Sequence, residues 1–596
     1  MTMNIRTMLL MLALILFGAF TRLIYLDAQS IWADESFTYI VTQSDTFWQT
    51  VASDVHPPIY FMLITGWTWL AGTSEFSLRL PSVLASVLAM ATLVGLTREC
   101  LRHRPHQQGG VLVLIALLLF ALSDLEVMVA QEARSYTLHG VWVTLSVWMY
   151  LRWIRLGRWQ DALAFVVSTL AIILTHYIGV FTPIALGAHA LLTLRGRRRW
   201  QTIGLLVLSA LIFLPWLWFV VIAQQIGKFA GDVVPAYNSD WGTLWYFRLA
   251  WLTDQWALML VLFGLGWVVV HRQGGRWQIM PPRYRVLILF ALWIVVPLAL
   301  AFTLNRWLPV LFDYRLTQIT PPILILIAYG LANLDRLARG ALIVAIVLYG
   351  VFIVDVYRPK LPWETYTALV TEFVRPGQAV ISEIGGGDYV FDYYLTPTLP
   401  EGVPWASTWQ WRKNTPETYE SGMLGFADST DHVWLARWID NSDAEVKLRA
   451  TNHIPTMQRT FIYEGNMLEV LRFDRLPDTP LMRFDNGMVL IDAQVYPDGL
   501  VDLWWQTDTA LSVDYTVSVK LLNASGQVIA QQDIQPQLGE QATSRWSVGQ
   551  VVYDPHDLQM PVADAQVMVQ VYQWQPDNLN VIDTVQGDEF LLLDME

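Results

Sequence analysis

Long runs of apolar residues dominate the first 356 residues of the chain and then stop. Eleven of these runs are long enough to form helices: residues 7–26, 80–97, 109–123, 136–153, 160–175, 178–194, 203–223, 251–270, 286–304, 319–334 and 340–355. A helix needs about 20 mostly apolar residues to cross a bilayer, so this succession predicts a polytopic membrane protein. A further run, 59–71, has only 13 residues and follows His56-Pro57-Pro58. A run of that length is more often interfacial or re-entrant.

The pattern changes near Tyr357-Arg358-Pro359, after which apolar runs shrink to strand length. In residues 357–478, strand patterns (379–384, 432–439, 460–463 and 467–473) alternate with helix patterns (388–395 and 442–450). This alternation predicts a small α/β layer. In residues 479–596, short strand-like runs (501–507, 514–522 and 565–573) are separated by Gly, Pro, Asp and Asn. That spacing is typical of an all-β sandwich.

Composition agrees with a chain that is largely solvated by lipid. Of the 596 residues 54% are hydrophobic and only 15% are charged, whereas soluble domains average about 25% charged residues. The 29 Trp residues suit the two membrane–water interfaces. A net charge of −13 argues against nucleic acid as a partner. Cys100 is the only cysteine, which excludes an intrachain disulfide and a Cys-based metal site.

Charges in the loops fix an orientation if the run 59–71 does not cross the membrane. One side then collects Arg98, Arg102, Arg104, Arg152, Arg155, Arg158, Arg195, Arg197, Arg198, Arg199, Arg272, Arg276, Arg283, Arg285, Arg336 and Arg339. The other side receives Asp34, Glu35, Asp45, Asp54, Glu75, Asp124, Glu126, Glu132, Asp232, Asp240 and Asp313. Short loops rich in Lys and Arg stay in the cytoplasm. The N-terminus is therefore predicted to be cytoplasmic, and the loop of Asp34 extracytoplasmic.

The predicted architecture follows from these patterns. It is a multi-pass α-helical protein of the plasma membrane with about eleven spans, or twelve to thirteen as the alternative. Residues 1–356 form the membrane domain, residues 357–478 an exported α/β domain, and residues 479–596 an exported β-sandwich.

Chemistry is expected at the outer end of the membrane domain. The pair Asp34-Glu35 sits just beyond the first apolar run, and carboxylates at such a boundary usually serve a partner, an ion or a reaction. Further polar residues fall at helix ends on the same side: Asp54, His56, Arg79, Gln131, Glu132, Arg134, Tyr136, His176, Tyr177, Tyr314 and Arg315. Any one of them could be an interfacial anchor or a satisfied helix end. Together they predict a single cavity in the outer leaflet.

The order of these motifs resembles that of the GT-C superfamily, whose members are glycosyltransferases that use polyprenyl-phosphate sugars. The resemblance is to its protein O-mannosyltransferase and aminoarabinose transferase branch, and it covers about residues 1–395. The matching motifs are Asp34-Glu35, Asp54-x-His56-Pro57-Pro58, Arg79-Leu-Pro81, Gln131-Glu-Ala-Arg134-Ser-Tyr136, Thr175-His176-Tyr177, and Tyr314-Arg315 ahead of Pro321-Pro322. The resemblance implies transfer of a sugar from a polyprenyl phosphate to an acceptor hydroxyl on the outer face.

Roles for two carboxylates follow from the resemblance. Asp34 would be the base that takes the acceptor proton as the hydroxyl attacks the anomeric carbon, and Glu35 would position the acceptor. The alternative for Glu35 is that it caps a helix beginning at Ser36. Direct displacement with one base implies inversion, whereas retention would need a second carboxylate, for which Asp54 is the near candidate.

The remaining site residues are expected to bind substrate. Arg134 and Arg315 are the leading ligands for the donor phosphate, with Arg79 behind them, because guanidinium suits bidentate phosphate contact. Their alternative is the snorkelling arginine at a helix end. The other expected substrate-binding residues are Asp54, His56, Glu132, Tyr136, His176, Tyr177 and Tyr314. The tyrosines could instead belong to an aromatic belt.

No cofactor is expected to be required. His56 and His176, with acidic residues nearby, would permit a divalent metal, but no HExxH spacing occurs. The expected partners are a polyprenyl-phosphate-linked sugar, membrane lipids, and an acceptor that could be protein, lipid or glycan.

Two other functions remain open at this stage. A transporter or flippase of lipid-linked sugars would use the same outer charges, although transporters usually show repeats with broken helices and mid-membrane charges. A membrane-anchored binding protein acting through its β domain would leave the outer polar groups without a purpose.

Overall fold

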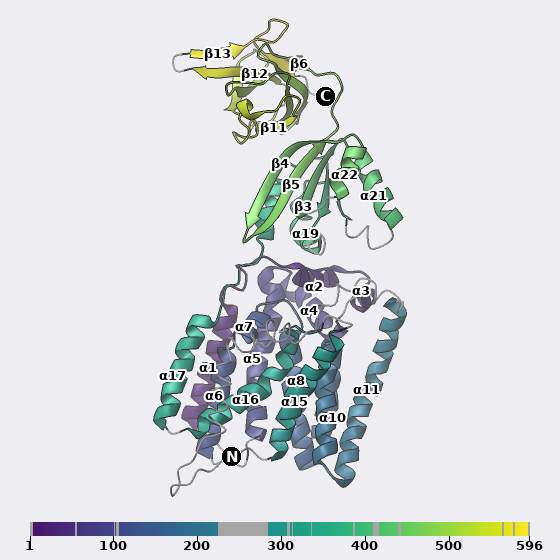
Figure 1. Ribbon diagram of the computed structural model, residues 1–596, viewed down its shortest axis with the longest axis vertical. Coiled ribbons are helices and arrows are strands. Elements are labelled where there is room, and N and C mark those ends of the chain that lie inside the picture. Colours follow the sequence, from purple (N-terminus) through teal and green to yellow (C-terminus); the bar gives the residue numbers. More distant parts are fainter. Residues whose placement is uncertain are drawn as a thin grey trace. The chain divides into compact units, whose positions relative to one another are not determined.

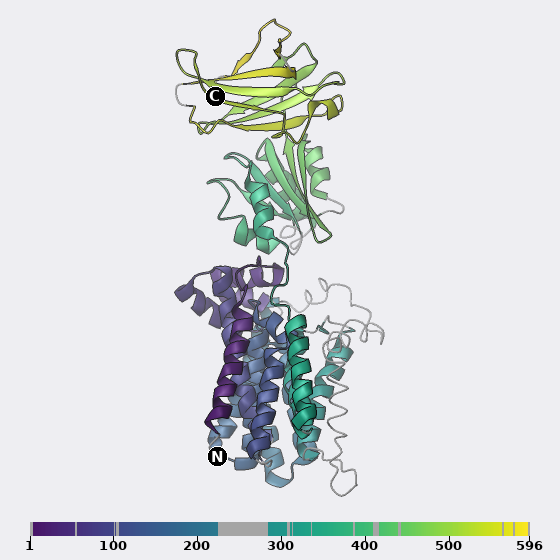
Figure 2. The same ribbon diagram turned by 90° about the vertical axis from the view of Figure 1, so that its left-hand side faces the viewer.

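The computed structural model describes residues 4–53, 56–100, 102, 106–224, 284–306, 310–312, 314–334, 336–384, 388–408, 416–438, 443–562, 565–575 and 578–593. The chain divides into a helical unit, Met1–Lys360, and a second unit, Leu361–Glu596, that contains every strand among these residues. Figures 1 and 2 show both units in two views.

Long helices build the first unit. They are α1 (Ile5–Leu23), α5 (Glu75–Cys100), α6 (His106–Ala121), α8 (Tyr136–Leu156), α9 (Trp159–Thr175), α10 (Phe181–Thr193), α11 (Gly196–Gln224), α15 (Tyr284–Leu304), α16 (Thr320–Asn333) and α17 (Arg336–Ile353). Close packing depends on small residues at some contacts. A Cβ at Gly95 on α5, for example, would lie 2.4 Å from the Trp148 ring on α8.

Five helical segments among the described residues are long and apolar enough to cross a membrane: Ile5–Leu23, Glu75–Cys100, Gly196–Val220, Tyr284–Leu304 and Tyr314–Asn333. A sixth would be the pair Gly109–Ala121 and Asp124–Ala130, which is bent by 59°. The protein is thus a helical membrane protein. The predicted count of about eleven spans stays a prediction, and one of those spans, 251–270, lies outside the described residues.

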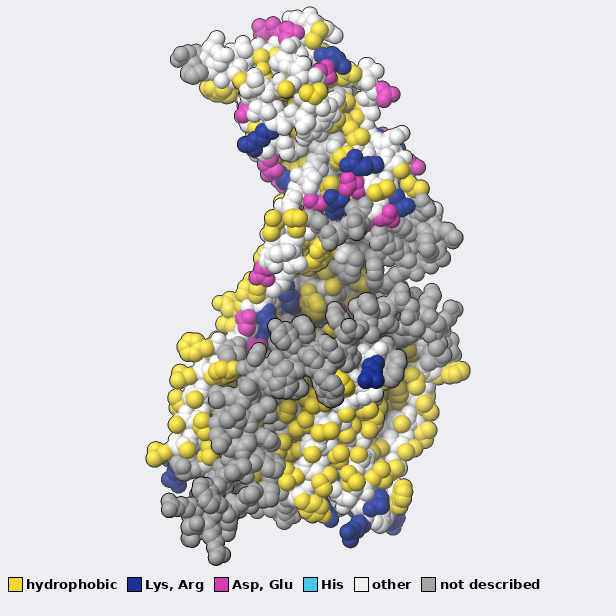
Figure 3. Space-filling view, viewed as in Figure 1, with side chains coloured by type: hydrophobic (Ala, Val, Ile, Leu, Met, Phe, Trp, Pro, Cys, Tyr) yellow, Lys and Arg dark blue, Asp and Glu magenta, His cyan; other side chains and the backbone are white. Residues whose placement is uncertain are grey.

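The surface of the helical unit has the polarity that a membrane requires. A broad area of hydrophobic side chains covers it, and Lys and Arg side chains gather at the end that carries the N-terminus (Figure 3). Exposed large apolar residues include Leu12 and Leu16 on α1 and Leu348 and Phe352 on α17. Such contiguous apolar surface needs lipid or another apolar partner to cover it.

Short helices occupy the chain between α1 and α5, at the other end of this unit (Figure 1). They are α2 (Ala33–Gln43), α3 (Phe47–Ser53) and α4 (Pro58–Ala71). α4 coincides with the predicted non-spanning run, and Pro58 stands in its first turn, where a proline costs no hydrogen bond. The start of α2 corrects the position of the predicted helix, which begins at Ala33 and not at Ser36, but Glu35 does cap it, because its Oε2 accepts a hydrogen bond from the Trp32 N–H at 3.4 Å.

Two further short segments complete this end. α7 (Asp124–Ala130) follows α6 at the 59° bend, and Ser123 caps it by accepting a hydrogen bond from the Glu126 N–H. η1 (Tyr177–Val180) precedes α10, and η3 (Tyr314–Ile319) precedes α16.

The second unit begins with a mixed sheet in the order β2-β1-β3-β5-β4. Its strands are β1 (Ala379–Glu383), β2 (Trp405–Ser407), β3 (His432–Trp438), β4 (Ile454–Tyr463) and β5 (Asn466–Asp474). β1 runs parallel to β2 and β3, while β5 runs antiparallel to β3 and β4. The accompanying helices are α18 (Trp363–Thr371), α19 (Asp388–Tyr394), α21 (Pro416–Asp428) and α22 (Asp443–Ala450). The predicted strands and helices of this segment are confirmed within one or two residues, except that β4 starts six residues earlier.

Two antiparallel sheets follow, in the orders β10-β9-β12-β13 (with β14 beside β12) and β11-β8-β7-β6. Their strands are β6 (Met482–Arg483), β7 (Met488–Val495), β8 (Leu500–Thr507), β9 (Thr516–Leu522), β10 (Val528–Ile534), β11 (Val552–Asp557), β12 (Gln566–Gln575), β13 (Asn578–Ile582) and β14 (Leu591–Leu593). Side chains from both sheets, among them Trp505, Val519 and Val569, share one buried core. The predicted strands at 501–507, 514–522 and 565–573 are confirmed.

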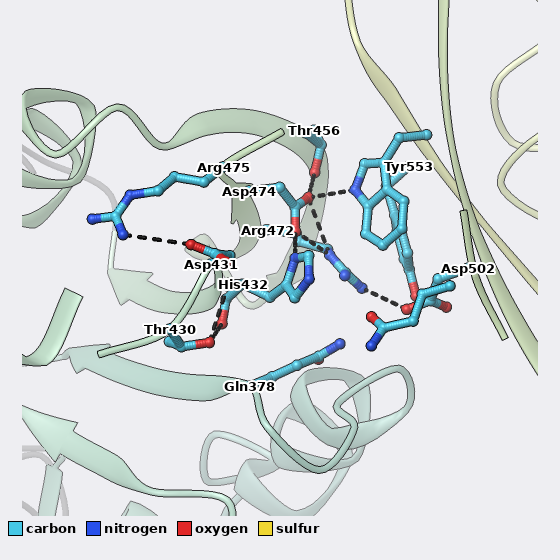
Figure 4. Close-up of polar contacts among 12 residues, drawn as sticks. Gln378, Thr430, Asp431, His432, Thr456, Arg472, Asp474, Arg475, Asp502 and Tyr553 are labelled. Carbon is cyan, nitrogen blue, oxygen red and sulfur yellow. Dashed lines mark hydrogen bonds and ion pairs between the residues drawn. The ribbon is translucent and has the colours of Figure 1, made fainter. Parts of the chain in front are cut away.

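A buried polar cluster joins the mixed sheet to the pair of antiparallel sheets (Figure 4). Arg472 on β5 is fully buried; its Nε donates to Asp474 at 2.9 Å and its Nη1 to Asp502 on β8 at 3.3 Å. Its guanidinium carbon lies 3.7 Å from the ring centre of Tyr553 on β11. These contacts hold the two parts of the second unit together.

Candidate active site

Most of the predicted site residues meet at the end of the helical unit that carries α2 and α4. They come from α2, the segment before α4, the α7–α8 loop, the α9–η1 junction and η3. These segments are up to about 280 residues apart in sequence, so only the fold brings them together.

The Glu35 carboxylate is fully buried and accepts four hydrogen bonds of 2.8 Å from three residues. Arg79 donates to both of its oxygens, from Nε and from Nη2, each at 2.8 Å. Lys360 Nζ donates to Oε2 at 2.8 Å, and the Ala133 N–H to Oε1 at 2.8 Å. Burial alone would raise the pKa of Glu35, but the Arg79 and Lys360 charges and hydrogen bonds outweigh it and hold the pKa well below its usual range. Glu35 is therefore an ionised anchor between several segments.

All five N–H groups of the Arg79 guanidinium donate hydrogen bonds within the protein. Besides its two bonds to Glu35, Nη1 donates to the carbonyls of Leu26 and Gln29, each at 2.8 Å, and Nη2 to that of Ser30 at 3.0 Å. A guanidinium has five N–H donors, and these contacts use all five. The geometry thus favours a structural role for Arg79 over the predicted contact with the donor phosphate.

Asp34 lies next to Glu35 on α2 but has a different environment. It is half-buried, and among the described residues its carboxylate makes no hydrogen bond or ion pair. Its backbone carbonyl accepts a hydrogen bond from Arg134 Nη1 at 2.8 Å. Its side chain is thus available to a substrate while its backbone is held in place.

Arg134 connects Asp34 to a cluster of rings. Its Nη2 lies 3.2 Å from Nδ1 of His56, which is itself buried before α4. The His56 ring meets the His176 ring edge-on at a centroid distance of 5.1 Å. Arg134 and His56 therefore lie between the Asp34 backbone and His176.

Aromatic rings continue the cluster towards η3. Tyr136 lies 5.9 Å from His176 and 4.9 Å from Tyr314, measured between ring centres. Arg315 places its guanidinium carbon 4.6 Å from the ring centre of Phe312. The charges of Arg134 and Arg315 both act on the His176 ring. The structure thus groups most of the residues predicted to bind the donor.

The other predicted residues lie beside this cluster or outside the description. Tyr177 accepts a hydrogen bond from Trp216 on α11 at 3.0 Å, so its hydroxyl is directed to that helix. Glu132 lies in the α7–α8 loop; burial raises its pKa to about 7, with Lys360 opposing that shift and the charges of Glu35 and Asp34 adding to it. Asp54 lies outside the described residues.

Sequence reasoning missed two residues of this region. His139 on α8 is buried, and its ring centre lies 5.6 Å from that of His176. The Nε2 atoms of both rings have no hydrogen-bond partner among the described residues. Buried polar atoms of this kind usually have a partner, so they point to a ligand or water. The signal for His139 was an ionisable residue inside an apolar run, three positions after Tyr136. Lys360, 325 residues from Glu35, gave no such signal.

The described residues include no group of three His, Cys, Asp or Glu side chains that could hold a metal ion. Within the described part of the chain, the cluster contains a carboxylate without a partner, two guanidinium groups, and two imidazoles whose Nε2 atoms have no hydrogen-bond partner. This combination can accept a proton and hold an anion.

The fold and site are those of a helical membrane protein with a polar cluster at one end of its helices. Comparisons with known proteins show what it is similar to. Residues 55–219 match the model of a family described as dolichyl-phosphate-mannose-protein mannosyltransferase. The predicted resemblance to the GT-C superfamily, in the branch of ArnT and the protein O-mannosyltransferases, is confirmed.

Several solved structures are similar to this chain. ArnT from Cupriavidus metallidurans in the apo state aligns with a TM-score of 0.54 and 12% identity, over 78% of this chain and 97% of that one. The same protein bound to undecaprenyl phosphate gives a TM-score of 0.51 at the same identity and coverage. The Archaeoglobus fulgidus oligosaccharyltransferase aligns over 97% of this chain and 99% of that one, with 11% identity and a TM-score of only 0.44. None of the curated proteins matches the sequence.

Proposed function

We propose that this protein is a membrane glycosyltransferase that transfers a sugar from a polyprenyl phosphate to an acceptor hydroxyl at the outer face of the membrane. The acceptor oxygen attacks the anomeric carbon and the bond from that carbon to the phosphate oxygen breaks. Asp34 takes the acceptor proton, and the phosphate leaves with the bonding electron pair. Displacement in one step inverts the anomeric carbon.

The contrast between Asp34 and Glu35 carries this proposal. The oxygens of Glu35 accept hydrogen bonds from Arg79, Lys360 and a backbone N–H, so Glu35 holds the start of α2 in place. Asp34, held through its backbone, keeps its carboxylate for another molecule. A general base must combine a fixed position with free oxygens, and of this pair only Asp34 has both.

Arg134 and Arg315 are the proposed ligands of the donor phosphate. Negative charge grows on this group as the glycosidic bond breaks, and guanidinium groups in a low-dielectric site stabilise it. His139 and His176 supply further unpaired nitrogens beside them. The binding of undecaprenyl phosphate by ArnT, which shares this fold, supports a lipid-phosphate donor.

The outer location of the site is part of the proposal. The Arg-rich turns, such as the one with Arg195 and Arg197, lie at the end of the helical unit opposite α2. Because Arg-rich turns stay in the cytoplasm, Asp34 and the second unit would be extracytoplasmic.

The test is transfer of label from a radiolabelled polyprenyl-phosphate sugar to an extract of candidate acceptors by the purified, reconstituted protein. Asp34→Asn should reduce transfer at least about a thousandfold while the variant stays monodisperse, because a neutral amide cannot accept the proton. Asp45→Asn, in the exposed turn just after the end of α2, is the matched control and should retain full activity. An Asp34→Asn variant with normal transfer would refute the assignment of the base. Movement of the labelled lipid across the bilayer without transfer would favour a flippase instead.

A further inference from the structure

The last six residues of the helical unit, Asp355–Lys360, form a strap along the candidate active site. Its first half is fixed to α7 and to the loop after it. The Asp355 N–H donates to Asp124 at 2.9 Å, and Arg358 forms an ion pair with the same carboxylate. Gln131 donates to the carbonyl of Val356 at 3.1 Å.

The end of the strap reaches the first turn of α2, which carries Asp34 and Glu35. Lys360 Nζ lies 2.8 Å from Glu35 Oε2, with the lysine side chain 16% exposed and the Glu35 side chain 0% exposed. The ammonium also lies 5.9 Å from the centre of the Trp32 ring. Trp32 directly precedes α2, so Lys360 touches both ends of the turn that presents Asp34.

Charge balance shows why a second cation is present. Arg79 alone would neutralise Glu35, yet two further carboxyl groups, Asp34 and Glu132, lie in the same region. A carboxylate that is buried among other carboxylates stays ionised only when cations and hydrogen bonds outweigh both burial and repulsion. Lys360 supplies that second charge, and it directly precedes Leu361, where the second unit begins.

We propose that Lys360 is a positioning residue, which holds Glu35 in place and through it sets the position of the Asp34 carboxylate. The strap thereby makes the chain segment that leads into the second unit a part of the active-site framework. This inference rests on the proposed transferase function.

The experiment compares full-length Lys360→Met and Lys360→Arg with the wild type. Lys360→Met should lower kcat about tenfold or more, because a shift of about 1 Å in a catalytic group is enough for such a loss. Lys360→Arg restores the charge and should recover kcat to within about threefold. Lys520→Met, the same substitution on β9 where the lysine donates to Gln570 in the second unit, is the control and should match the wild type.

Two further measurements separate positioning from a general loss of structure. In a Glu35→Gln background, Lys360→Met should cause no additional loss of kcat, since its partner carboxylate is already gone. The acid limb of the pH profile should move to higher pH in Lys360→Met and return in Lys360→Arg. The groups that face Glu35 are Arg79 from α5, Lys360 from the strap, and Asp34 and Glu132 beside it, so removing one cation eases protonation of Glu35.

Hydrogen exchange gives a readout that does not depend on activity. The Ala133 N–H, which bonds to Glu35, should exchange faster in Lys360→Met and normally in Lys520→Met. Wild-type activity with unchanged kcat and exchange in Lys360→Met would overturn the inference and leave the transferase assignment intact. An inactive wild type would instead overturn the proposed function. Additive losses in the double variant would likewise rule out action through Glu35.

Discussion

Side chains of neighbouring residues on a helix point about 100° apart, so Asp34 and Glu35 on α2 have different surroundings and can have different roles. Glu35 turns into the protein, where Arg79 and Lys360 meet it. Asp34 turns to the side where its carboxylate has no partner among the described residues. One acidic pair thus supplies both an anchor and a reactive group, and each substitution should have its own signature.

Arg79→Lys should damage stability and leave donor binding unchanged. A lysine cannot replace five fixed N–H donors, so the buried Glu35 and three backbone carbonyls lose partners. Breaking a buried ion pair costs about 3 to 5 kcal/mol of unfolding free energy. Thermal unfolding in detergent measures this loss, and polyprenyl-phosphate binding to the folded fraction measures affinity. Arg152→Lys, at a partly exposed pair with Asp161, should cost less than about 1 kcal/mol. If Arg79→Lys were stable but bound the donor tenfold more weakly, Arg79 would be a phosphate ligand after all.

Arg134→Lys should show the opposite signature. Its guanidinium spans the Asp34 carbonyl and the His56 ring, beside His176. A lysine would keep the charge but lose the fork, so donor affinity should fall about tenfold, or about 1.4 kcal/mol. Calorimetric titration with polyprenyl phosphate measures it, with Arg155→Lys, paired to Glu99 on another part of the unit, as the control. Unchanged affinity would remove Arg134 from the phosphate site.

Sequence reasoning found the members of the site but not their division of roles. The ring and guanidinium residues Arg134, Tyr136, His176 and Tyr314 could be predicted because they stand at ends of apolar runs on one side. The structural roles of Arg79 and Glu35 depend on carbonyls and on Lys360, which lie far away in sequence and carry no periodic signal. Whether the hydrogen-bonding groups of a side chain are already occupied depends on the tertiary structure, so the spacing of residues in the sequence does not reveal it.

At the scale of elements, the strands and the apolar helices, including the short α4, followed their hydrophobic patterns, whereas three short helices did not. α2, α3 and α7 stand where the sequence predicted loops, and α7 begins with Asp124 and contains Glu126. Their polar residues are satisfied by distant partners, as Asp124 is by Arg358 and the Asp355 N–H. Tertiary contacts of this kind stabilise helices too short to form alone.

The contact of β5 with β8 and β11 predicts how the second unit responds to acid. Burial alone would raise the pKa of Asp474, but the Arg472 charge and bonds from His432 and Thr456 hold it well below its ordinary value of 3.8 (Figure 4). A carboxylate with a lowered pKa stabilises the folded state above its ordinary pKa and loses that contribution as the pH falls below it. Hydrogen exchange of β5 in the full-length protein should therefore accelerate below about pH 4.

Asp474→Asn tests this contact at neutral pH. Removing one partner leaves Arg472 buried without its nearest counter-charge, which should cost about 3 to 5 kcal/mol of local stability. Faster exchange of β5 and β8 at pH 7, together with a flatter dependence on acid, is the expected result. Asp508→Asn, at an exposed pair with Arg483, should change exchange little. Equal behaviour of the two variants would mean that the buried cluster does not stabilise the unit.

At the scale of the whole molecule, charge is distributed unequally between the two ends of the helical unit. Exposed arginines such as Arg197 stand at the start of α11. The turn between α10 and α11 lies at the end of the helical unit opposite α2 (Figure 1). The translocation machinery retains short Arg-rich loops in the cytoplasm. The predicted orientation therefore depends on residues that take no part in the proposed chemistry.

This asymmetry predicts the result of thiol labelling. In a Cys100→Ser background, Ser525→Cys in the exposed turn between β9 and β10 should react with a membrane-impermeant maleimide in intact cells. Arg197→Cys should react only after permeabilisation, because the start of α11 is predicted to face the cytoplasm. The reverse pattern would place Asp34 inside the cell, where the proposed reaction could not use an acceptor exposed on the outer face. Labelling of both positions in intact cells would mean leaky membranes, which a cytoplasmic marker protein detects. The orientation and the identity of the base can thus be tested independently, since the first depends on arginines and the second on one carboxylate.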